Sequence, residues 1–143
     1  MEDGPRVCSI ARTLEVVGDR WALLVVREAF LGVHRFDEIQ RKTGAPRDIL
    51  AARLKKLVET GVLERRLYQE RPARYEYQLT EAGRGLYAVV TALRQWGDRY
   101  VTAPGPTPAR FAHTCGAHDP AQFVCPDCGE PIEAGSYRRE ADR

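Results

Sequence analysis

Two short helical patterns separated by a glycine-containing turn constrain the fold of this chain more than any other feature. The apolar spacing predicts one helix over residues 35–42, a turn over 43–45, and a second helix from Pro46, at its first position, to Thr60. The buried stripe of the second helix is predicted to be Leu50, Leu54, Leu57 and Val58. Helix, short turn and helix is the arrangement of a helix-turn-helix unit.

Two more helices precede this unit. Apolar residues recur at helical spacing over residues 7–17, and Gly18 ends that helix. Asp19 is placed to cap a second helix, over about 20–31, because its carboxylate can accept hydrogen bonds from the free N–H groups of the first turn. This helix is apolar on most of its sides, which predicts that it lies at the centre of the core.

A hairpin and a last helix follow. Residues 62–68 and 74–79 are predicted strands, the second half-buried because apolar and polar residues alternate along it, and 69–73 form a polar tip. Thr80 can cap a long helix over about 81–101. Because so small a core cannot cover all the apolar residues of that helix, we predict a subunit interface formed by Leu86, Val90, Leu93, Trp96 and Tyr100. The predicted fold class is mainly α with a small β-hairpin.

The positive charge of the chain is concentrated in one block. The 143 residues carry a net charge of +2, but residues 34–74 contain eleven Lys or Arg against six Asp or Glu. Such a block indicates a surface that faces a polyanion. The alternative is an ordinary solvated face.

The polar side of the helix that ends at Thr60 is narrow enough to fit the DNA major groove. Arg47 lies near the start of this helix, where it can reach a guanine edge or a phosphate. Arginines of the hairpin would neutralise phosphates without reading sequence. The candidate DNA-binding residues are Arg47, Asp48, Ala51, Ala52, Arg53, Lys55, Lys56, Arg71 and Arg74. The alternative is that these charges serve only solubility.

A zinc-ribbon-like tail is predicted after a proline-rich linker over residues 103–109. Within residues 110–135, Cys125-Pro126-Asp127-Cys128-Gly129 is a turn that points two thiolates at one metal ion. Cys115 with His118, or with His113 in its place, would complete a tetrahedral site for structural zinc. The alternative is a tail without metal. Residues 136–143 are expected to be a flexible terminus.

Several segments together carry a resemblance to a known family. They are Cys8, Gly18-Asp19-Arg20-Trp21, Arg35-Phe36-Asp37-Glu38-Ile39, Ala52-Arg53-Leu54-Lys55-Lys56-Leu57, Gly61-Val62-Leu63-Glu64-Arg65 and Tyr75-Glu76-Tyr77-Gln78-Leu79-Thr80-Glu81-Ala82-Gly83. Over residues 7–102 the chain resembles the HxlR-type winged helix-turn-helix regulators, relatives of the MarR group. The resemblance implies a domain that dimerises through its terminal helices and binds a two-fold operator. Pro46-Arg47-Asp48 departs from the family, which often has a small polar residue there.

The resemblance also implies a role for Cys8. Some members of the family use a cysteine at this position to sense oxidants, quinones or aldehydes, which requires an accessible thiolate. The alternative is that Cys8 packs at the dimer interface as a small apolar residue. The expected effector is accordingly an oxidant or a small molecule.

Membrane proteins and enzymes are the classes that the sequence supports least. The longest apolar run, residues 21–26, is much shorter than the roughly 20 residues of a membrane span, and the acidic start lacks the apolar core of a secretory signal. The expected location is therefore the cytoplasm. We see no nucleophile–base pair and no phosphate loop in the sequence, and His34, alone before a helix, is interpreted as a cap or a surface residue.

We therefore expect a homodimeric, sequence-specific regulator of transcription that binds double-stranded DNA at a palindromic operator and acts as a repressor. The alternative is a protein-interaction module that uses the winged scaffold and the zinc-type tail as docking surfaces. Steeply salt-dependent retention on specific DNA distinguishes the two.

Overall fold

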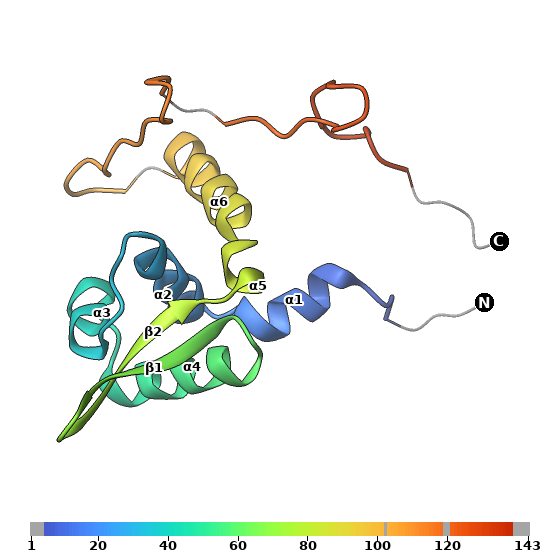
Figure 1. The fold of residues 1–143 in the computed structure, drawn as a ribbon. Coiled ribbons are helices and arrows are strands. Elements are labelled where there is room, and N and C mark those ends of the chain that lie inside the picture. The colour runs from blue at the N-terminus through green and yellow to red at the C-terminus, as the bar shows by residue number, and fades with distance from the viewer. Residues whose placement is uncertain (1–4, 102, 119–120, 139–143) are drawn as a thin grey trace. The chain divides into compact units, whose positions relative to one another are not determined.

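The computed structural model describes residues 5–101, 103–118 and 121–138 (Figure 1). Its elements are α1 (Ser9–Val17), α2 (Arg20–Phe30), α3 (Phe36–Thr43), α4 (Arg47–Glu59), β1 (Leu63–Glu70), β2 (Ala73–Leu79), α5 (Glu81–Arg84) and α6 (Tyr87–Tyr100). The first four residues of the acidic start, two residues of the predicted zinc tail (119–120) and the last five of the predicted flexible terminus lie outside the described residues. The fold is mainly helical with one antiparallel hairpin, as the sequence predicts.

Helix α2 is the centre of the core, which confirms its prediction. It packs against α1, α3, α4 and β2, and Val25 and Val26 are fully buried. Its N-terminus is capped as expected, because Oδ1 of Asp19 accepts hydrogen bonds from the backbone N–H groups of residues 21 and 22 at 2.9 and 3.2 Å. The apolar pattern gives no sign that Glu28 is buried as well; its carboxylate lies 2.6 Å from the guanidinium of Arg27.

The turn between α3 and α4 has the geometry of a helix-turn-helix unit. Gly44 ends α3 with a φ of +73°, a left-handed conformation that favours glycine. Leu50, Leu54 and Leu57 are fully buried, so the predicted stripe of α4 faces the core, with Val58 partly buried beside it. One detail of the prediction is wrong. Pro46 is the N-cap of α4 and not its first residue, because its backbone is extended and its carbonyl accepts the first helical hydrogen bond, from Leu50.

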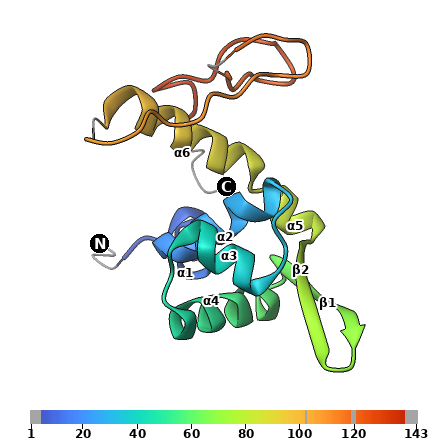
Figure 2. The same cartoon turned by 90° about the vertical axis from the view of Figure 1, so that its left-hand side faces the viewer.

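The hairpin projects past the helices (Figure 2). Its limits and its burial therefore differ from those that the sequence predicts. Residues 69 and 70 still pair with 74 and 73, so the loop is only two residues long and the predicted tip over 69–73 is too wide. Tyr77 and Leu79 pack against the core at the base of the hairpin, whereas Tyr75, on the same face, is exposed. The predicted half-burial of this strand therefore holds only at its base.

The single long helix predicted over 81–101 is wrong, because the chain breaks into α5 and α6. Thr80 does cap α5, since its Oγ1 accepts a hydrogen bond from the N–H of Gly83 at 3.1 Å. A Cβ atom at Gly83 would lie 2.2 Å from the carbonyl oxygen of Val62, so only glycine lets the backbone approach the start of β1 this closely. The next turn tightens, with the N–H of Leu86 donating to the carbonyl of Gly83, and α6 begins at Tyr87.

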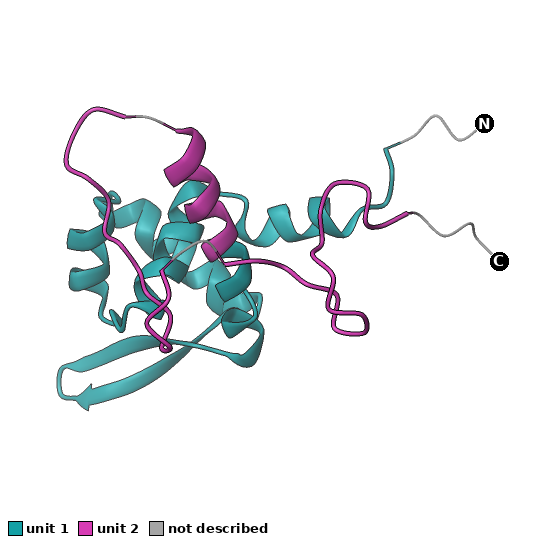
Figure 3. Ribbon diagram, turned by 90° about the horizontal axis from the view of Figure 1, so that it is seen from above, with its two compact units in different colours: residues 1–90 teal, residues 91–143 magenta. Residues whose placement is uncertain are grey.

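The chain divides into two compact units, residues 1–90 and 91–143 (Figure 3). The first contains the helix-turn-helix and the hairpin. The second contains the last turns of α6, the linker and two small tail turns, each closed by an isolated antiparallel bridge, Ala112 with His118 and Val124 with Pro131. No helix among the described residues has the length and apolarity that crossing a membrane requires.

Candidate nucleic-acid interface

The solvent-facing side of α4 carries nearly all the residues predicted to touch DNA on this helix. The exposed ones are Arg47, Asp48, Ala51, Ala52, Lys55 and Lys56, and only Arg53 is half-buried. Because Ala51 and Ala52 are small, they leave room for the helix to approach a groove closely. Lys55 lies 3.8 Å from Glu59, whereas Lys56 has no ion-pair partner within the part of the chain that the structure describes.

Arg47 is held in place by three side chains of α3. Its guanidinium lies 2.9 Å from Oδ1 of Asp37 and 3.3 Å from Oε1 of Gln40, and it stacks over the ring of Phe36 at 4.8 Å. The side chain is nevertheless 66% exposed. Arg47 therefore stands oriented at the start of α4, and DNA would have to compete with Asp37 for it.

Arg53 ties α4 to the start of α2. Its Nε lies 3.0 Å from Oδ1 of Asp19, the same oxygen that caps α2, and about two-thirds of both side chains are covered. Burial raises the pKa of Asp19, but Arg53 and the backbone N–H groups of Ala22 and Trp21 outweigh it, so the pKa lies below its ordinary value of 3.8. Since the charge of Arg53 is already paired, its position favours holding α4 over contacting DNA.

The end of the hairpin presents two unpaired arginines. Arg71 and Arg74 are exposed, and neither guanidinium has an ion-pair partner among the described residues. Nearer the helices, Arg65 stacks on the ring of Tyr75 at 4.1 Å and Arg66 pairs with Glu64. On the hairpin, the arginines without an ion-pair partner among the described residues therefore lie at the end that extends furthest from the helices.

His34 and Arg35, which the sequence analysis did not place in the site, fix the direction of the hairpin. The carbonyl of His34 accepts a hydrogen bond from the N–H of Tyr77 at 2.9 Å, and Nδ1 of His34 lies 3.0 Å from the carbonyl oxygen of Tyr77. Arg35 forms a bridge to Glu76 and stacks over Tyr68 at 4.3 Å. His34 is therefore a strand-like anchor rather than a cap. Two residues are too few to produce a strand pattern, so no periodicity could have revealed this.

The predicted dimer residues fall into two groups. Leu86 and Val90 pack against the core of the first unit, whereas Leu93, Trp96 and Tyr100 are each more than half exposed. A second exposed apolar face, whose exposure the helical pattern does not reveal, lies on and just before α1 and consists of Val7, Ile10 and Leu14. Cys8 is half-buried at the N-cap of α1 and makes no capping hydrogen bond with its side chain.

The structure places the candidate metal ligands in two separate pairs, Cys125 with Cys128 and Cys115 with His113, which the prediction gave only as the alternative to His118. Nδ1 of His113 lies 3.1 Å from Sγ of Cys115. In the second pair, hydrogen bonds from the backbone N–H groups of Cys128 and Asp127, together with the Cys128 side chain, lower the pKa of the Cys125 thiol. Within the described ranges, no three His, Cys, Asp or Glu side chains lie close enough to hold one metal ion.

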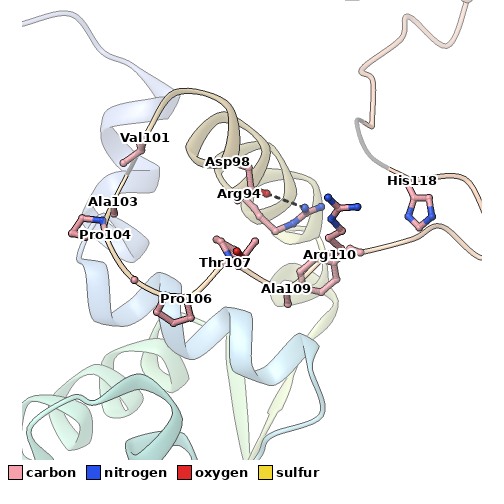
Figure 4. A pocket seen from close by; sticks show the side chains of 13 residues that line it. Arg94, Asp98, Val101, Ala103, Pro104, Pro106, Thr107, Ala109, Arg110 and His118 are labelled. Atoms are coloured by element: carbon pink, nitrogen blue, oxygen red, sulfur yellow. Dashed lines mark hydrogen bonds and ion pairs between the residues drawn. The ribbon is translucent and has the colours of Figure 1, made fainter.

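Each unit has a pocket lined by described residues. The pocket of the second unit, of about 660 Å³, is lined by the proline-rich linker, by the Arg94–Asp98 ion pair and by His118 (Figure 4). His118 thus faces the linker, whereas His113 contacts a cysteine. The pocket of the first unit, of about 450 Å³, lies at the base of the hairpin and is lined by Ala29, Phe30, His34, Gln78, Leu79, Arg84 and Tyr87.

Comparison with known proteins identifies the family of this chain. The family model for the HxlR-like helix-turn-helix matches residues 16–104. This chain belongs to the HxlR-like helix-turn-helix family. It is 49% identical over 133 residues to an uncharacterised HTH-type transcriptional regulator of Mycobacterium tuberculosis, an alignment that covers 92% of this chain and 84% of the relative.

Solved structures agree with this assignment. The crystal structure of PA1607, described as a candidate transcription factor, matches with a TM-score of 0.81 and 41% identity over 94% of this chain and 95% of the other. The redox regulator HypR in its reduced form matches with a TM-score of 0.59 and 30% identity, over 64% of this chain and 91% of its own. The HxlR-like chain described here is accordingly a transcriptional regulator with a DNA-binding helix-turn-helix fold, and not an enzyme.

Proposed function

We propose that this HxlR-like protein binds a palindromic operator as a homodimer, with α4 in the major groove and the hairpin along the phosphate backbone. The observation that carries the proposal is the combination, in one unit, of a small, polar face on α4 with two exposed arginines at the end of the hairpin that form no ion pair with any described residue. Arg47, Asp48, Ala51, Ala52, Lys55 and Lys56 would line the groove, and Arg71 and Arg74 would contact phosphates. Arg53 would hold α4 in position through its ion pair with Asp19 instead of contacting DNA.

We propose a dimer because large apolar residues of α6 are exposed to solvent in a single chain. Leu93, Trp96 and Tyr100 share one side of α6, and the rings of Trp96 and Tyr100 lie 5.5 Å apart. Large exposed apolar residues gathered on one helix face are typical of a subunit interface. A two-fold dimer would present two α4 helices to successive major grooves, about 34 Å apart, which is the reason for expecting a palindrome.

The regulatory output that we propose is repression. Occupying DNA is enough to block transcription from an overlapping promoter, and DNA binding and dimerisation are the two capacities for which this chain offers residues. Because the target is DNA, the proposed location is the cytoplasm.

An oxidant acting at Cys8 is the effector that we propose first. Cys8 is partly accessible at the start of α1, and a solved structure similar to this chain belongs to a redox regulator. A small molecule in the 450 Å³ pocket is the second candidate, since that pocket contacts both the hairpin base and the start of α6. Release from DNA by an oxidant in the wild type, and its loss in Cys8→Ser, would support the first. An unchanged response in Cys8→Ser would exclude it.

A footprint on the DNA upstream of the protein's own coding region tests the proposed function. Protection of a symmetric site, with an affinity that falls steeply as salt rises, is the expected result. Binding to all duplexes alike, at every salt concentration, would favour the alternative of a protein-interaction module.

A further inference from the structure

Two turns of the tail, residues 112–118 and 124–131, are built on the same backbone plan. In the first, the N–H of His113 donates to the carbonyl of Ala117 and the N–H of Gly116 donates to the carbonyl of His113, both at 2.8 Å. In the second, the N–H of Cys125 donates to the carbonyl of Glu130 and the N–H of Gly129 to the carbonyl of Cys125, again at 2.8 Å. The same two bonds therefore close both turns.

The bridges and the glycines agree with this correspondence. An antiparallel bridge closes each turn, Ala112 with His118 in the first and Val124 with Pro131 in the second. In both turns the bridge joins the residue just before the first candidate ligand to the residue two positions after the glycine. Gly116 and Gly129 both have positive φ, +90° and +75°. The turns differ only in length, with one residue between His113 and Cys115 and two between Cys125 and Cys128.

The side chains occupy equivalent places as well. The backbone N–H of Cys115 donates to Nδ1 of His113 at 3.3 Å, and the backbone N–H groups of residues 127 and 128 donate to the sulfur of Cys125. Zinc would displace the bond to Nδ1, because that nitrogen has a single lone pair, whereas the sulfur of Cys125 can keep its N–H donors. His113 and Cys115 approach to 3.1 Å, close to the separation of about 3.5 Å that a nitrogen and a sulfur have when they ligate one tetrahedral zinc ion. Cys125 and Cys128 are in side-chain contact too.

From this repeated plan we infer that the tail consists of two matched zinc knuckles. His113 and Cys115 of the first and Cys125 and Cys128 of the second, which lie as separate pairs among the described residues, would come together on one zinc ion. The ligands are soft thiolates and an imidazole, a set that selects zinc over magnesium or calcium. Each thiol gives up its proton when it binds. His118 is not a ligand, because it stands where the second knuckle has Pro131, and it lines the linker pocket instead.

The exposure of the tail explains why a metal would be needed. Phe111, Phe123, Val124 and Tyr137 are all more than a third exposed, so these turns bury little apolar surface of their own. Nine residues separate Cys115 from Cys125, which is enough chain for the two knuckles to face each other across one ion. Zinc would then take the place of a hydrophobic core, as it does in other small zinc domains.

Metal analysis of the full chain, purified in reductant without chelator, tests this inference. About one zinc ion per chain is expected, and Co²⁺ in its place should give the visible absorption of a tetrahedral thiolate site. Cys115→Ser and Cys125→Ser should lose the metal and open the tail to protease. His113→Ala should lose zinc at a chelator concentration that leaves the matched control, His118→Ala, fully loaded.

Three results would overturn the inference. Protein without metal after growth in zinc would exclude the site altogether. Loss of zinc in His118→Ala but not in His113→Ala would show that the correspondence between the two turns is wrong. Half an ion per chain, lost in Cys125→Ser but kept in Cys115→Ser, would show that second knuckles of two chains share the metal. Metal content is measured without DNA, so none of these outcomes depends on the proposed function.

Discussion

Nε of Arg53 in α4 lies 3.0 Å from Oδ1 of Asp19, and that single oxygen also caps α2. One carboxylate therefore sets the start of the central helix and ties to it the helix proposed to read DNA. The position of α4 depends on this contact from one side and on the buried leucines of its apolar stripe from the other. Contacts of this kind allow a surface helix to present a fixed set of side chains to a groove.

Removing the carboxylate at position 19 should destabilise the first unit. Asp19→Ala should cost about 1 kcal/mol from the lost cap alone, measured by urea unfolding. Asp19→Asn keeps a capping oxygen and loses only the charge facing Arg53, so its loss should be smaller. Equal losses in the two variants would show that the pair with Arg53 matters more than the cap.

The same pair should give stability a defined dependence on pH. The pKa of Asp19 is lower in the folded protein than its ordinary value of 3.8, because Arg53 and two backbone N–H groups outweigh the effect of burial. The unfolded chain therefore takes up the proton first as the pH falls. The stability difference between wild type and Asp19→Asn should be constant above that ordinary value and disappear as the pH drops through the lowered one. A difference that grows on acidification would contradict this assignment.

Arg47→Ala should weaken binding to the specific operator by about 1–3 kcal/mol while leaving non-specific binding nearly unchanged, if Arg47 reads a base. The side chain is two-thirds exposed, so the fold should tolerate the change. Titrations with operator and with scrambled duplex measure both affinities. Asp37→Asn is the informative partner variant, because it removes the charge that holds Arg47 in the free protein. Unchanged operator affinity in Arg47→Ala would mean that α4 reads DNA through other residues.

Arg71→Ala should weaken binding to all sequences alike and reduce the slope of log affinity against log salt by about one, because one phosphate contact is lost. Arg138→Ala removes the same charge from the second unit and should leave the slope unchanged. A loss of affinity confined to the operator would show instead that the hairpin reads bases.

Charge introduced on the exposed side of α6 should produce monomers. Leu93→Glu or Trp96→Glu would place a carboxylate in the proposed interface, where desolvating it is costly. Light scattering should report half the mass, and operator binding should be lost with it. Ala88→Glu is the matched control, because this exposed residue lies roughly 140° around the helix from Leu93. A Trp96→Glu variant that remains dimeric would exclude α6 as the interface.

Local patterns in the sequence predict the helices well, and contacts between distant segments explain most of the differences. The stripe of α4 and the cap at Asp19 depend on residues within a few positions of each other, so spacing reveals them. Gly83 in α5 closely approaches the carbonyl of Val62 just before the helix breaks, and no helical pattern encodes such a contact between distant segments. The hairpin anchor at His34 is two residues long, too short for any period.

The candidate site shows the same division. Exposure of the predicted residues on α4 follows from the helical period, but the pairing of Arg53 with Asp19 joins positions 34 residues apart. The correspondence between His113 and Cys125 is hidden in the sequence because the two knuckles differ by one residue in length. Hydrogen bonds reveal it, since the same backbone groups close both turns.

Selection of bound duplexes from a random library, using the purified full chain, tests the central proposal most directly. A dimer that places one α4 in each of two successive major grooves should enrich an inverted repeat, with half-site centres about 10 base pairs apart. Arg47→Ala should relax the preference at one symmetric position in each half-site. Enrichment of a single site without two-fold symmetry, or of no sequence at all, would contradict the account.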